Sequence, residues 1–562
     1  MGGLGRGAAR GAWIAALATG CGGTKPASVG EDGGPDVVRV TLLGTTDVHG
    51  HLLPYEYPTD RPARESLAQV GTLVDSVRAA DGRVLLFDSG DLLQGSALDE
   101  YEARAGRDSV HPVIAAMNEL GYAAAAIGNH EYNYGLPFLH SALEDARFPF
   151  LSANTLRAGT DSVAFDPYVL LDLDGVRVGV VGFTTPGVAI WDRDNVRGRL
   201  EFMDIVEAAR RWVPRLEAER PDLVVAVVHS GVAPGSSYTA EGVPEENAVA
   251  RLAGVNGIDV IFAGHTHVRI DGRLIGRTLV VQAGRHANAL AVVHIDLERH
   301  AGRWRVRSRE GFTIGTADVP ARPWRDPRIR DAHERTLAWL REPIGFTPDR
   351  WSAAEGRVRD TPIADLVTAV ERGVSGADLA STAVFSPSAA FGPGPISRRD
   401  ILGLYVYPNT LRAVRISGAD LAAYLEWSAR YFNGYPADPI VNDSVPGYNF
   451  DLVSGVEYTL DLRRPVGRRV TRLSREGVAV SPADTFTLAV NNYRQSGGGG
   501  AAMIGRAPLV YGDEIPISQR IIDFVRARDT LRIADVYREN WRLEPAAARR
   551  QLLSDEATRS RH

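Results

Sequence analysis

The chain alternates between short, continuous apolar runs and amphipathic stretches. Because the runs carry hydrophobic residues at consecutive positions, the strands that they predict are expected to be buried on both faces. Residues 65–80 and 205–219, which lie between runs, repeat their apolar residues at helical spacing. The predicted strands cover residues 37–46, 83–91, 122–129, 176–183, 222–231 and 258–267. The pattern therefore predicts an α/β fold class for a first, layered domain over residues 37–318.

A second domain is expected beyond residue 318, because 562 residues exceed the usual size of one hydrophobic core. Residues 319–349, which are rich in Pro and Arg, are predicted to form a linker with a connecting helix. An α+β domain is predicted over residues 350–545. Residues 546–562 are highly charged, and we expect them to form a frayed tail.

The first 36 residues have the features of an export signal followed by a tether. Two arginines precede a ten-residue apolar run that is too short to span a bilayer, and Cys21 follows that run. We interpret residues 1–21 as a signal peptide with a lipobox-like end, Cys21 as the lipidated residue, and residues 22–36 as a flexible tether. The protein would then lie in the periplasm or at the cell surface, held to a membrane by its lipid anchor. Ordinary signal cleavage near residues 18–20, with Cys21 incidental, is the alternative.

The overall composition limits the classes of molecule that the protein is expected to bind. The chain is 44% hydrophobic and 23% charged, as in ordinary globular proteins, and its formal net charge is −6. That balance argues against a nucleic-acid polymer as a partner. Cys21 is the single cysteine, so no intramolecular disulfide can form. We expect the protein to be a monomer.

Several predicted strands end in residues that bind metal ions. In an open α/β sheet the carboxyl ends of the strands meet at one edge, so these residues are expected to converge. The set combines imidazoles, carboxylates and one amide without a thiolate, which favours Zn, Mn or Fe over Ca or Mg alone. Five unrelated turns are the alternative, but five such motifs at five strand ends argue against coincidence. The residues are Asp47, His49, Asp91, Asn129, His130, His229, His265 and His267.

This donor set predicts hydrolytic chemistry at phosphorus. Two divalent metal ions bridged by a carboxylate lower the pKa of a water and stabilise both the attacking and the departing oxygens of a phosphoryl group. His130 follows the candidate ligand Asn129 and is free to face substrate, where it could protonate a leaving alkoxide. We therefore expect a metal-dependent hydrolase with His130 as its catalytic residue.

The same motifs resemble the five blocks of the calcineurin-like metallophosphoesterases, and the two-domain plan is similar to the secreted nucleotidase family. The resemblance implies a four-layer metallophosphoesterase β-sandwich flanked by helices, plus a second α+β C-terminal nucleotidase domain. It assigns Asp47, His49, Asp91 and His267 to one metal ion. It assigns Asp91, Asn129, His229 and His265 to the other.

Within that family the segment "GNHEYNYG" resembles the branch of 2′,3′-cyclic-nucleotide 2′-phosphodiesterase/3′-nucleotidases. The 5′-nucleotidases usually carry Asp where this chain has Asn133, and that Asp orients the catalytic histidine. Asn133 can still form a hydrogen bond with His130, but it would not hold an imidazolium as a carboxylate does. Other segments point to the same branch, including "SGDLLQGSALDEY" at 89–101 and "LYVYPNTL" at 404–411.

The second domain offers residues for nucleotide recognition. By the resemblance, Tyr407 and Tyr493 would stack on the two faces of the base, and Asn409 would meet the edge of the base. Asn491 is a further candidate for substrate binding. The glycine run at 497–500 would let the backbone approach the ligand closely. Spacing alone would equally fit ordinary half-buried strand tyrosines.

These expectations combine into one leading hypothesis and several rivals. The leading hypothesis is a hydrolase of 2′,3′-cyclic nucleotides and 3′-nucleotides that releases nucleoside and phosphate outside the cytoplasm. A 5′-nucleotidase or UDP-sugar hydrolase on the same scaffold is the nearest alternative. A hydrolase of sulfur compounds is disfavoured because the base-clamp tyrosines are present. A surface binding protein that has lost catalysis is disfavoured because every candidate ligand is present.

Overall fold

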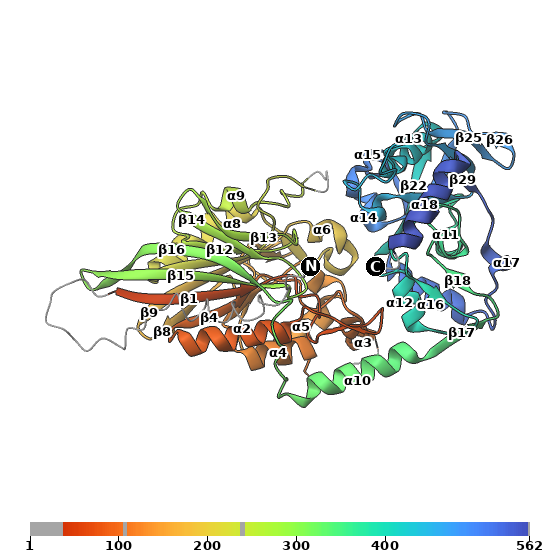
Figure 1. The fold of residues 1–562 in the computed structure, drawn as a ribbon. Helices are drawn as coiled ribbons and strands as arrows, with labels where there is room; N and C mark the ends of the chain where they lie inside the picture. Colours follow the sequence, from red (N-terminus) through yellow and green to blue (C-terminus); the bar gives the residue numbers. More distant parts are fainter. Residues whose placement is uncertain (1–36, 105–109, 237–241, 408, 560–562) are drawn as a thin grey trace, which may run out of the picture.

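The computed structural model describes residues 37–104, 110–236, 242–407 and 409–559. The expected signal peptide, Cys21 and the tether lie outside these ranges. Figure 1 shows two bodies, a first domain built from the N-terminal half and a second from the C-terminal half, with a long helix running along one side of both. No helix in the described ranges is both long and apolar enough to cross a bilayer.

The first domain contains two six-stranded mixed sheets, in which the parallel strands of the sequence prediction are central. The order in the first sheet is β16-β15-β1-β4-β5-β6. Its strands are β1 (Val37–Thr45), β4 (Val84–Asp88), β5 (Ala124–Ala126), β6 (Phe150–Leu151), β15 (Ala289–His300) and β16 (Arg303–Gly315). The order in the second sheet is β13-β14-β12-β11-β9-β8. Its strands are β8 (Tyr168–Leu173), β9 (Val176–Thr184), β11 (Leu223–His229), β12 (Val260–Ala263), β13 (Arg269–Ile275) and β14 (Thr278–Ala283).

Burial on both faces explains why the strands are continuously apolar. In β1, Val40 and Leu42 contribute to the core between the two sheets, whereas Leu43 faces the helices on the outer side. Helices α2 (Leu67–Ala80), α4 (Pro112–Leu120) and α5 (Leu136–Glu144) contribute to the core outside the first sheet. Helices α8 (Ile205–Ala218) and α9 (Val249–Leu252) do the same outside the second. The domain is thus a four-layer sandwich, which confirms the predicted fold class.

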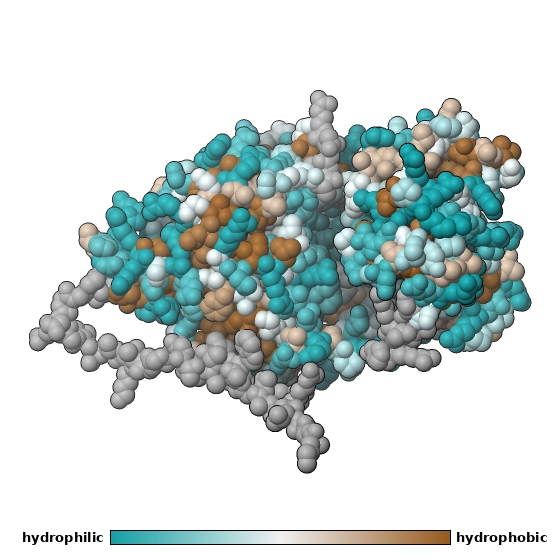
Figure 2. All heavy atoms as spheres, turned by 45° about the horizontal axis from the view of Figure 1, so that its top comes forward, coloured by the Kyte–Doolittle hydropathy of each residue, from teal (hydrophilic) through white to brown (hydrophobic). Residues whose placement is uncertain are grey.

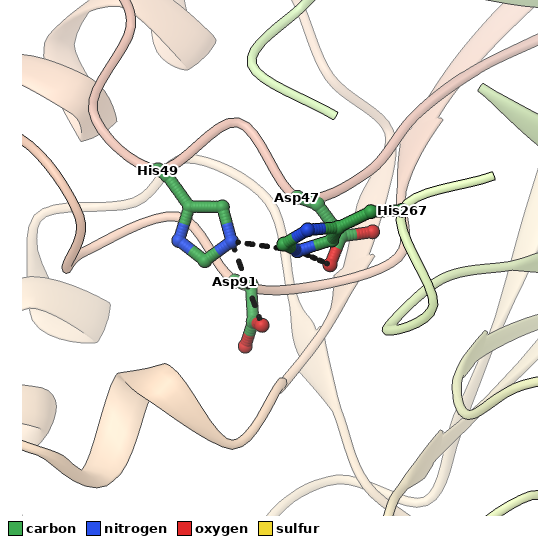
Figure 3. A group of neighbouring side chains, drawn as sticks. All are labelled: Asp47, His49, Asp91 and His267. Carbon is green, nitrogen blue, oxygen red and sulfur yellow. Dashed lines mark hydrogen bonds and ion pairs between the residues drawn. The ribbon is translucent and has the colours of Figure 1, made fainter. Parts of the chain in front are cut away.

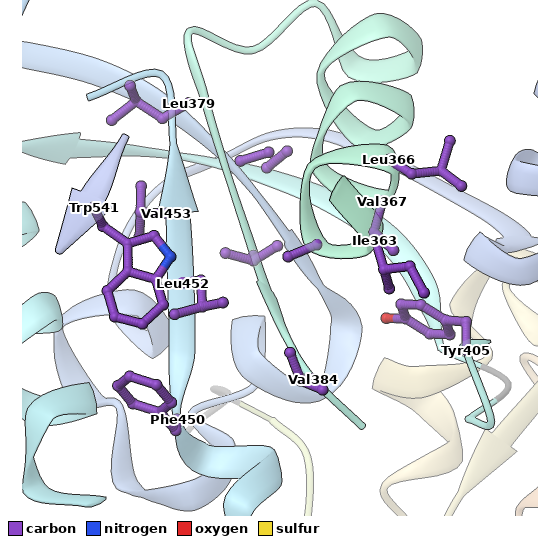
Figure 4. Close-up of a cluster of buried hydrophobic side chains, with 14 of the residues drawn as sticks. Ile363, Leu366, Val367, Leu379, Val384, Tyr405, Phe450, Leu452, Val453 and Trp541 are labelled. Atoms are coloured by element: carbon purple, nitrogen blue, oxygen red, sulfur yellow. The ribbon is translucent and has the colours of Figure 1, made fainter. Parts of the chain in front are cut away.

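The second domain is built on a five-stranded sheet of order β23-β19-β27-β22-β28 beside a four-stranded one of order β26-β25-β24-β29. Figure 4 shows part of its core, where side chains from α11 and from the strands meet. The first sheet contains β19 (Leu379–Ala383), β22 (Thr410–Ser417), β23 (Asp451–Ser454), β27 (Thr485–Asn491) and β28 (Leu509–Pro516). The second contains β24 (Glu457–Asp461), β25 (Val470–Arg475), β26 (Val478–Ala479) and β29 (Trp541–Glu544). The main helices are α11 (Pro362–Ser375), α12 (Arg398–Leu404), α13 (Gly418–Ser428) and α16 (Ile517–Arg526).

Two boundaries differ from the sequence prediction. Strand β17 (Pro343–Thr347) pairs with β21 (Gly394–Ser397), so the second domain begins before residue 350. The expected frayed tail is instead helix α18 (Ala546–Arg559), and its Ala548 and Leu552 are buried in the core of the second domain. These two apolar residues lie four positions apart and therefore share one face of the helix, which anchors it.

The connecting helix α10 (Pro327–Arg341) belongs structurally to the first domain. Its Ile329, Ala332 and Leu340 are buried in the core outside the first sheet. At its far end it contacts α12 of the second domain, where the Arg398 guanidinium lies 4.7 Å from the centre of the Trp339 ring. Figure 2 shows the surface hollowed between the two bodies. The connection thus leaves the two domains facing each other across that hollow.

Candidate metal centre and substrate site

The loops at the carboxyl ends of the central strands bring two groups of metal-binding side chains together. Asp91 belongs to both groups, and within each group one donor atom per residue lies within 4.8 Å of the others. Its Oδ2 lies 3.9 Å from His49 Nε2 and 3.1 Å from His229 Nε2. The first group, shown in Figure 3, is Asp47, His49, Asp91 and His267. The second is Asp91, His229 and His265.

Asn129 adds an amide oxygen to the second group. Its Oδ1 lies 3.0 Å from His229 Nε2 and 3.1 Å from His265 Nδ1. The residues that the family resemblance assigned to two metal ions therefore lie together in the structure. Asp91 lies between the two groups, where it could bind both ions. Nitrogen and oxygen donors that face a common point fit a pair of divalent ions.

The backbone at these ligands is unusual. Five of them have a φ between 48° and 72°, the left-handed region that few residues other than Gly, Asn and Asp enter readily. They are Asp47, His49, Asp91, His265 and His267. Each lies in a turn shortly after the end of a strand, and its side chain points toward the other metal-binding residues. Such strained conformations are typical of functional sites.

Glycine is required where two of these turns meet. A Cβ on Gly90, whose φ is 91°, would lie 2.6 Å from the backbone nitrogen of Gly128. A Cβ on Gly128 would lie 2.2 Å from Asp91 Oδ1. Only glycine lets the two loops approach closely enough for Asp91 to reach both groups.

A second set of contacts orients the imidazole ligands. His49 Nδ1 is 2.7 Å from the carbonyl oxygen of Gln94, and His229 Nδ1 is 2.7 Å from that of Ser89. His265 Nε2 lies 2.7 Å from Glu246 Oε1. Because a carbonyl or carboxylate oxygen only accepts, each of these ring nitrogens carries the proton. The other nitrogen of each ring is thereby left to bind metal, as in known metal sites.

Glu131 fastens the two central loops to each other. Its buried carboxylate accepts the backbone N–H groups of Asp91 (2.9 Å), Leu92 (2.6 Å) and Gly128 (2.6 Å). Sequence reasoning quoted this residue within "GNHE" but gave it no role, as it also gave none to Glu246. The role of Glu131 could have been predicted, because a carboxylate near a glycine turn can accept hydrogen bonds from backbone N–H groups that lack other partners.

Electrostatics in the cluster follow from burial opposed by neighbouring charge. Burial alone would lower the pKa of His229, but the Asp91 carboxylate outweighs it and raises the pKa to about 10. At His49 burial prevails over Asp91 and lowers the pKa to about 3. The pKa of Asp91 lies well below its usual range, because the surrounding histidines overcome burial. The shared carboxylate is therefore ionised at neutral pH, as a bridging ligand must be.

His130 lies beside the cluster without belonging to either group. Its backbone N–H donates to Asp91 Oδ1 across 2.9 Å, and its Nε2 lies 3.9 Å from Asp91 Oδ2. Its Nδ1 donates to Asn133 Oδ1 across 2.6 Å. The side chain is 31% exposed. The ring is thus held at the rim of the cluster, with Nε2 on the side of the shared Asp91 carboxylate.

The two tyrosines predicted to hold the base are both half-exposed. Tyr407 is 40% exposed and Tyr493 is 42% exposed. Tyr448, which sequence reasoning did not single out, packs edge-on against Tyr407 with ring centres 6.3 Å apart, and its presence helps to raise the pKa of Tyr493. Burial raises the pKa of Tyr407, and Arg285 opposes that rise. Tyr407 of the second domain therefore lies within electrostatic range of Arg285, a residue of the first domain.

Two other predictions for the second domain need refinement. Asn491 is buried, and its side-chain oxygen caps helix α14 (Asn492–Gln495) by accepting the Arg494 N–H at 2.8 Å; contact of its amide nitrogen with substrate stays a prediction. The glycine run supports Tyr493, because a Cβ on Gly498 would lie 2.6 Å from that ring. Asn409 is half-buried beside the tyrosines, and its backbone oxygen accepts the Ile517 N–H.

Comparison with known proteins assigns each of the two domains to a family. The calcineurin-like phosphoesterase family matches residues 40–269, and the C-terminal domain of 5′-nucleotidases matches residues 343–506. A 2′,3′-cyclic-nucleotide 2′-phosphodiesterase/3′-nucleotidase of Yersinia enterocolitica is 32% identical over 82% of this chain and 81% of its own length. The chain therefore belongs to the calcineurin-like metallophosphoesterases that carry a 5′-nucleotidase C-terminal domain. The resemblance deduced from the motifs is confirmed.

Two further relatives show the range of the family. The trifunctional nucleotide phosphoesterase protein YfkN of Bacillus subtilis is 30% identical over 93% of this chain, which spans 40% of that protein's length. A Staphylococcus aureus protein described as a candidate 5′-nucleotidase, solved in complex with alpha-ketoglutarate, is 25% identical. It superposes with a TM-score of 0.73, covering 90% of this chain and all of that one. This chain is thus a metal-dependent phosphoesterase of the nucleotidase family.

Proposed function

We propose that the protein hydrolyses 2′,3′-cyclic nucleotides and 3′-nucleotides, releasing nucleoside and phosphate. The observation that carries the proposal is the pair of metal-binding groups that share Asp91, with His130 Nε2 lying 3.9 Å from the shared carboxylate. The activity for which the Yersinia relative is named supports the substrate class. Asn133 in place of an acid, as in the branch that the sequence resembles, supports it further.

Each residue of the proposed site would have a separate role in hydrolysis. A bound pair of divalent ions supplies an activated water at neutral pH and stabilises charge at the phosphoryl group. His130 delivers a proton from Nε2 to the departing ribose oxygen, which would otherwise leave as a strongly basic alkoxide. Tyr407 and Tyr493 hold the base and so fix the distance from the base to the phosphorus. For a cyclic substrate, water adds to phosphorus and the bond to the 2′ oxygen breaks, which leaves a 3′-phosphate for the second hydrolysis.

A screen of nucleotides tests this proposal. Purified protein with added Mn²⁺ or Zn²⁺ should release phosphate from 3′-AMP and convert 2′,3′-cyclic AMP to adenosine through 3′-AMP. Phosphate release from 5′-AMP should be far slower. Equal or faster hydrolysis of 5′-AMP or UDP-glucose would instead establish the alternative, a 5′-nucleotidase or UDP-sugar hydrolase, which the match to a 5′-nucleotidase C-terminal domain favours.

The proposed ions are Zn, Mn or Fe, because imidazole predominates among the donors. Elemental analysis of protein purified with metal present should give close to two equivalents. Well under one equivalent, without hydrolysis, would support the remaining alternative of a surface protein that binds nucleotides but has lost catalysis.

We further propose that the protein is exported and acts as a monomer anchored through a lipid on Cys21. Expression of the full chain with labelled palmitate should give labelled protein in the membrane fraction, and Cys21→Ser should remove the label and release soluble protein. Unlabelled wild-type protein in the soluble fraction would favour simple signal cleavage.

A further inference from the structure

Three side chains form a line that leads away from the metal cluster. His130 Nδ1 contacts Asn133 Oδ1 at 2.6 Å, and Asn133 Nδ2 contacts Asp192 Oδ1 at 2.8 Å. Asp192 lies 59 positions further along the chain than Asn133. Neither the motifs nor the family assignment gives Asp192 a role.

Asp192 is held firmly in its place. It is 1% exposed and lies between the short helices α6 (Val188–Trp191) and α7 (Arg193–Val196). The Asn195 side chain ties α7 to the catalytic loop by donating to the carbonyl oxygens of Tyr132 at 3.0 Å and Asn133 at 3.3 Å. Trp191 stacks on the metal-binding residue His265, with ring centres 5.5 Å apart. The segment is therefore fixed against both halves of the site.

The Asp192 carboxylate determines which way the Asn133 amide points. Asn133 Nδ2 donates to Asp192 Oδ1 and the amide oxygen faces His130 Nδ1, which is the orientation that an acceptor-only carboxylate requires. In the opposite orientation two acceptor oxygens would meet at hydrogen-bond distance in a buried place, which is strongly unfavourable. Because Asn133 then offers His130 an acceptor only, Nδ1 keeps its proton throughout, and the proton that the ring gives up as an acid is the one on Nε2.

We propose that Asp192 is a positioning residue of the catalytic histidine, acting through Asn133. A carboxylate in direct contact would hold the Nδ1 proton of His130 itself; here the carboxylate stands one residue further away and acts through an amide. Nε2 is thereby kept as the ring nitrogen that faces the substrate, in a fixed orientation. This inference rests on the proposed role of His130 as the acid that protonates a ribose oxygen.

An exchange of the two side chains tests the proposal. Asp192→Asn is nearly isosteric but can both donate and accept, so the Asn133 amide loses its enforced orientation. Asn133→Asp alone places two carboxylates in contact. The double variant moves the carboxylate next to His130 and lets the amide introduced at position 192 donate to it, which rebuilds an ordered line of hydrogen bonds. Asp194→Asn, in the adjoining helix α7 but exposed, is the matched control.

On 3′-AMP, each single variant should lower kcat by about 10- to 100-fold, a part of the ~10²–10⁴ that a positioned acid contributes, with KM little changed. The double variant should recover to within about 3-fold of wild type, a coupling that additive defects cannot produce. On p-nitrophenyl phosphate, whose leaving group needs no proton, all variants should keep wild-type kcat. Metal content should be the same throughout.

Three results would overturn the proposal. One is wild-type activity of Asp192→Asn on 3′-AMP. Another is an equal loss on both esters, which would mark Asp192 as merely structural. The third is a double variant no better than the worse single. If thermal melting shows that Asp192→Asn does not fold, comparison of Asn133→Asp with the double variant still decides.

Failure of the proposed function would be seen separately. The exchange is measured on whichever nucleotide the wild type hydrolyses, because 2′,3′-cyclic, 3′- and 5′-nucleotides all leave through a ribose oxygen. A wild type that prefers 5′-AMP would contradict the substrate proposal, while the recovery of the double variant on 5′-AMP would still support Asp192 as the positioning residue.

Discussion

The two domains bury charged side chains in opposite ways. In the first, Asp47 and Asp91 are brought next to several histidines by turns with left-handed backbone, and the donors point at common centres. In the second, Asp451 is just as buried but is fully engaged: Arg494 donates to its two oxygens at 2.7 and 3.0 Å, and the Tyr424 hydroxyl donates to it as well. The first arrangement needs a bound cation to be satisfied. The second already contains its cation and serves as a rigid support.

That support lies directly beneath the residues that we propose to hold the base. The Arg494 guanidinium lies 5.4 Å from the centre of the Tyr493 ring and 4.5 Å from that of Trp427. It also donates to the Gly498 carbonyl oxygen in the glycine run. Charge in the second domain thus orders an apolar binding surface, whereas charge in the first domain is available for chemistry. Substitutions of buried charges should therefore lower activity in the first domain and stability in the second.

The largest effect is expected at the shared ligand. Asp91→Asn should lower kcat more than about 10³-fold, because the ions supply several kcal/mol of transition-state stabilisation. Elemental analysis should show loss of metal, while the melting temperature should not fall, since Asn tolerates a left-handed φ and removes a buried charge. Asp174→Asn is the matched control, an exposed left-handed aspartate in the turn between β8 and β9. Retained metal and activity in Asp91→Asn would remove the basis of the comparison.

The corresponding change in the second domain should act on stability. Arg494→Met leaves Asp451 buried without its cation and should destabilise the domain by about 3–5 kcal/mol, measured by urea unfolding. Metal content of the folded fraction should be unchanged. Arg506→Met, which breaks the exposed pair with Asp420, should cost less than about 1 kcal/mol. Similar losses in the two variants would contradict the supporting role of Arg494.

A smaller effect is expected at the proposed base clamp. Tyr407→Ala should raise KM for nucleotides about 5- to 150-fold, because stacking on one aromatic ring contributes about 1–3 kcal/mol. Hydrolysis of p-nitrophenyl phosphate, which has no base, should keep its wild-type KM. Tyr168→Ala on β8 controls for general loss of an aromatic residue. An equal rise in KM for both esters would move Tyr407 from base recognition to domain packing.

The smallest effect concerns pH. Burial, together with the neighbouring Asp365, raises the pKa of Asp360 to about 7. The folded state then binds a proton more tightly than the unfolded state, so this contribution to stability is present below pH ~4 and is lost as pH rises through ~7. Asp360→Asn keeps an acceptor for the Asn540 N–H and should reduce the fall in stability between pH 5 and 8, by of order 1–3 kcal/mol. Calorimetry at both pH values, with exposed Asp529→Asn as control, would show it; an unchanged slope would contradict it.

The sequence predicted the first domain better than the second for a physical reason. Strands buried on both faces leave continuous apolar runs, and their ends carry the ligands, so position along the chain was enough to place Asp47 and Asp91 near His229. The long antiparallel pair β15 and β16 was missed because it lies beyond the last ligand motif. The helix α18 was also missed, although Ala548 and Leu552 have helical spacing.

Residues that act through a neighbouring side chain could not be predicted from the sequence. Asp192 and Glu246 lie in loops, and their contacts with Asn133 and His265 depend on how distant segments pack. The resemblance suggested Asn491 as a substrate-binding residue, but it did not reveal that the side-chain oxygen caps a helix. Spacing along the chain identifies donors at strand ends; it does not reveal which polar group lies opposite them.

The left-handed turns at five of the ligands also bear on how this protein can change over evolutionary time. β-Branched side chains are strongly disfavoured at those positions by the backbone alone, whether or not a metal ion is bound. In a lineage under no pressure to catalyse, most other residues there would still cost about 1–2 kcal/mol of stability, and the cost would be lowest for Gly, Asn and Asp. Loss of hydrolysis over evolutionary time would thus be expected to appear first as replacement of these ligands by Gly, Asn or Asp.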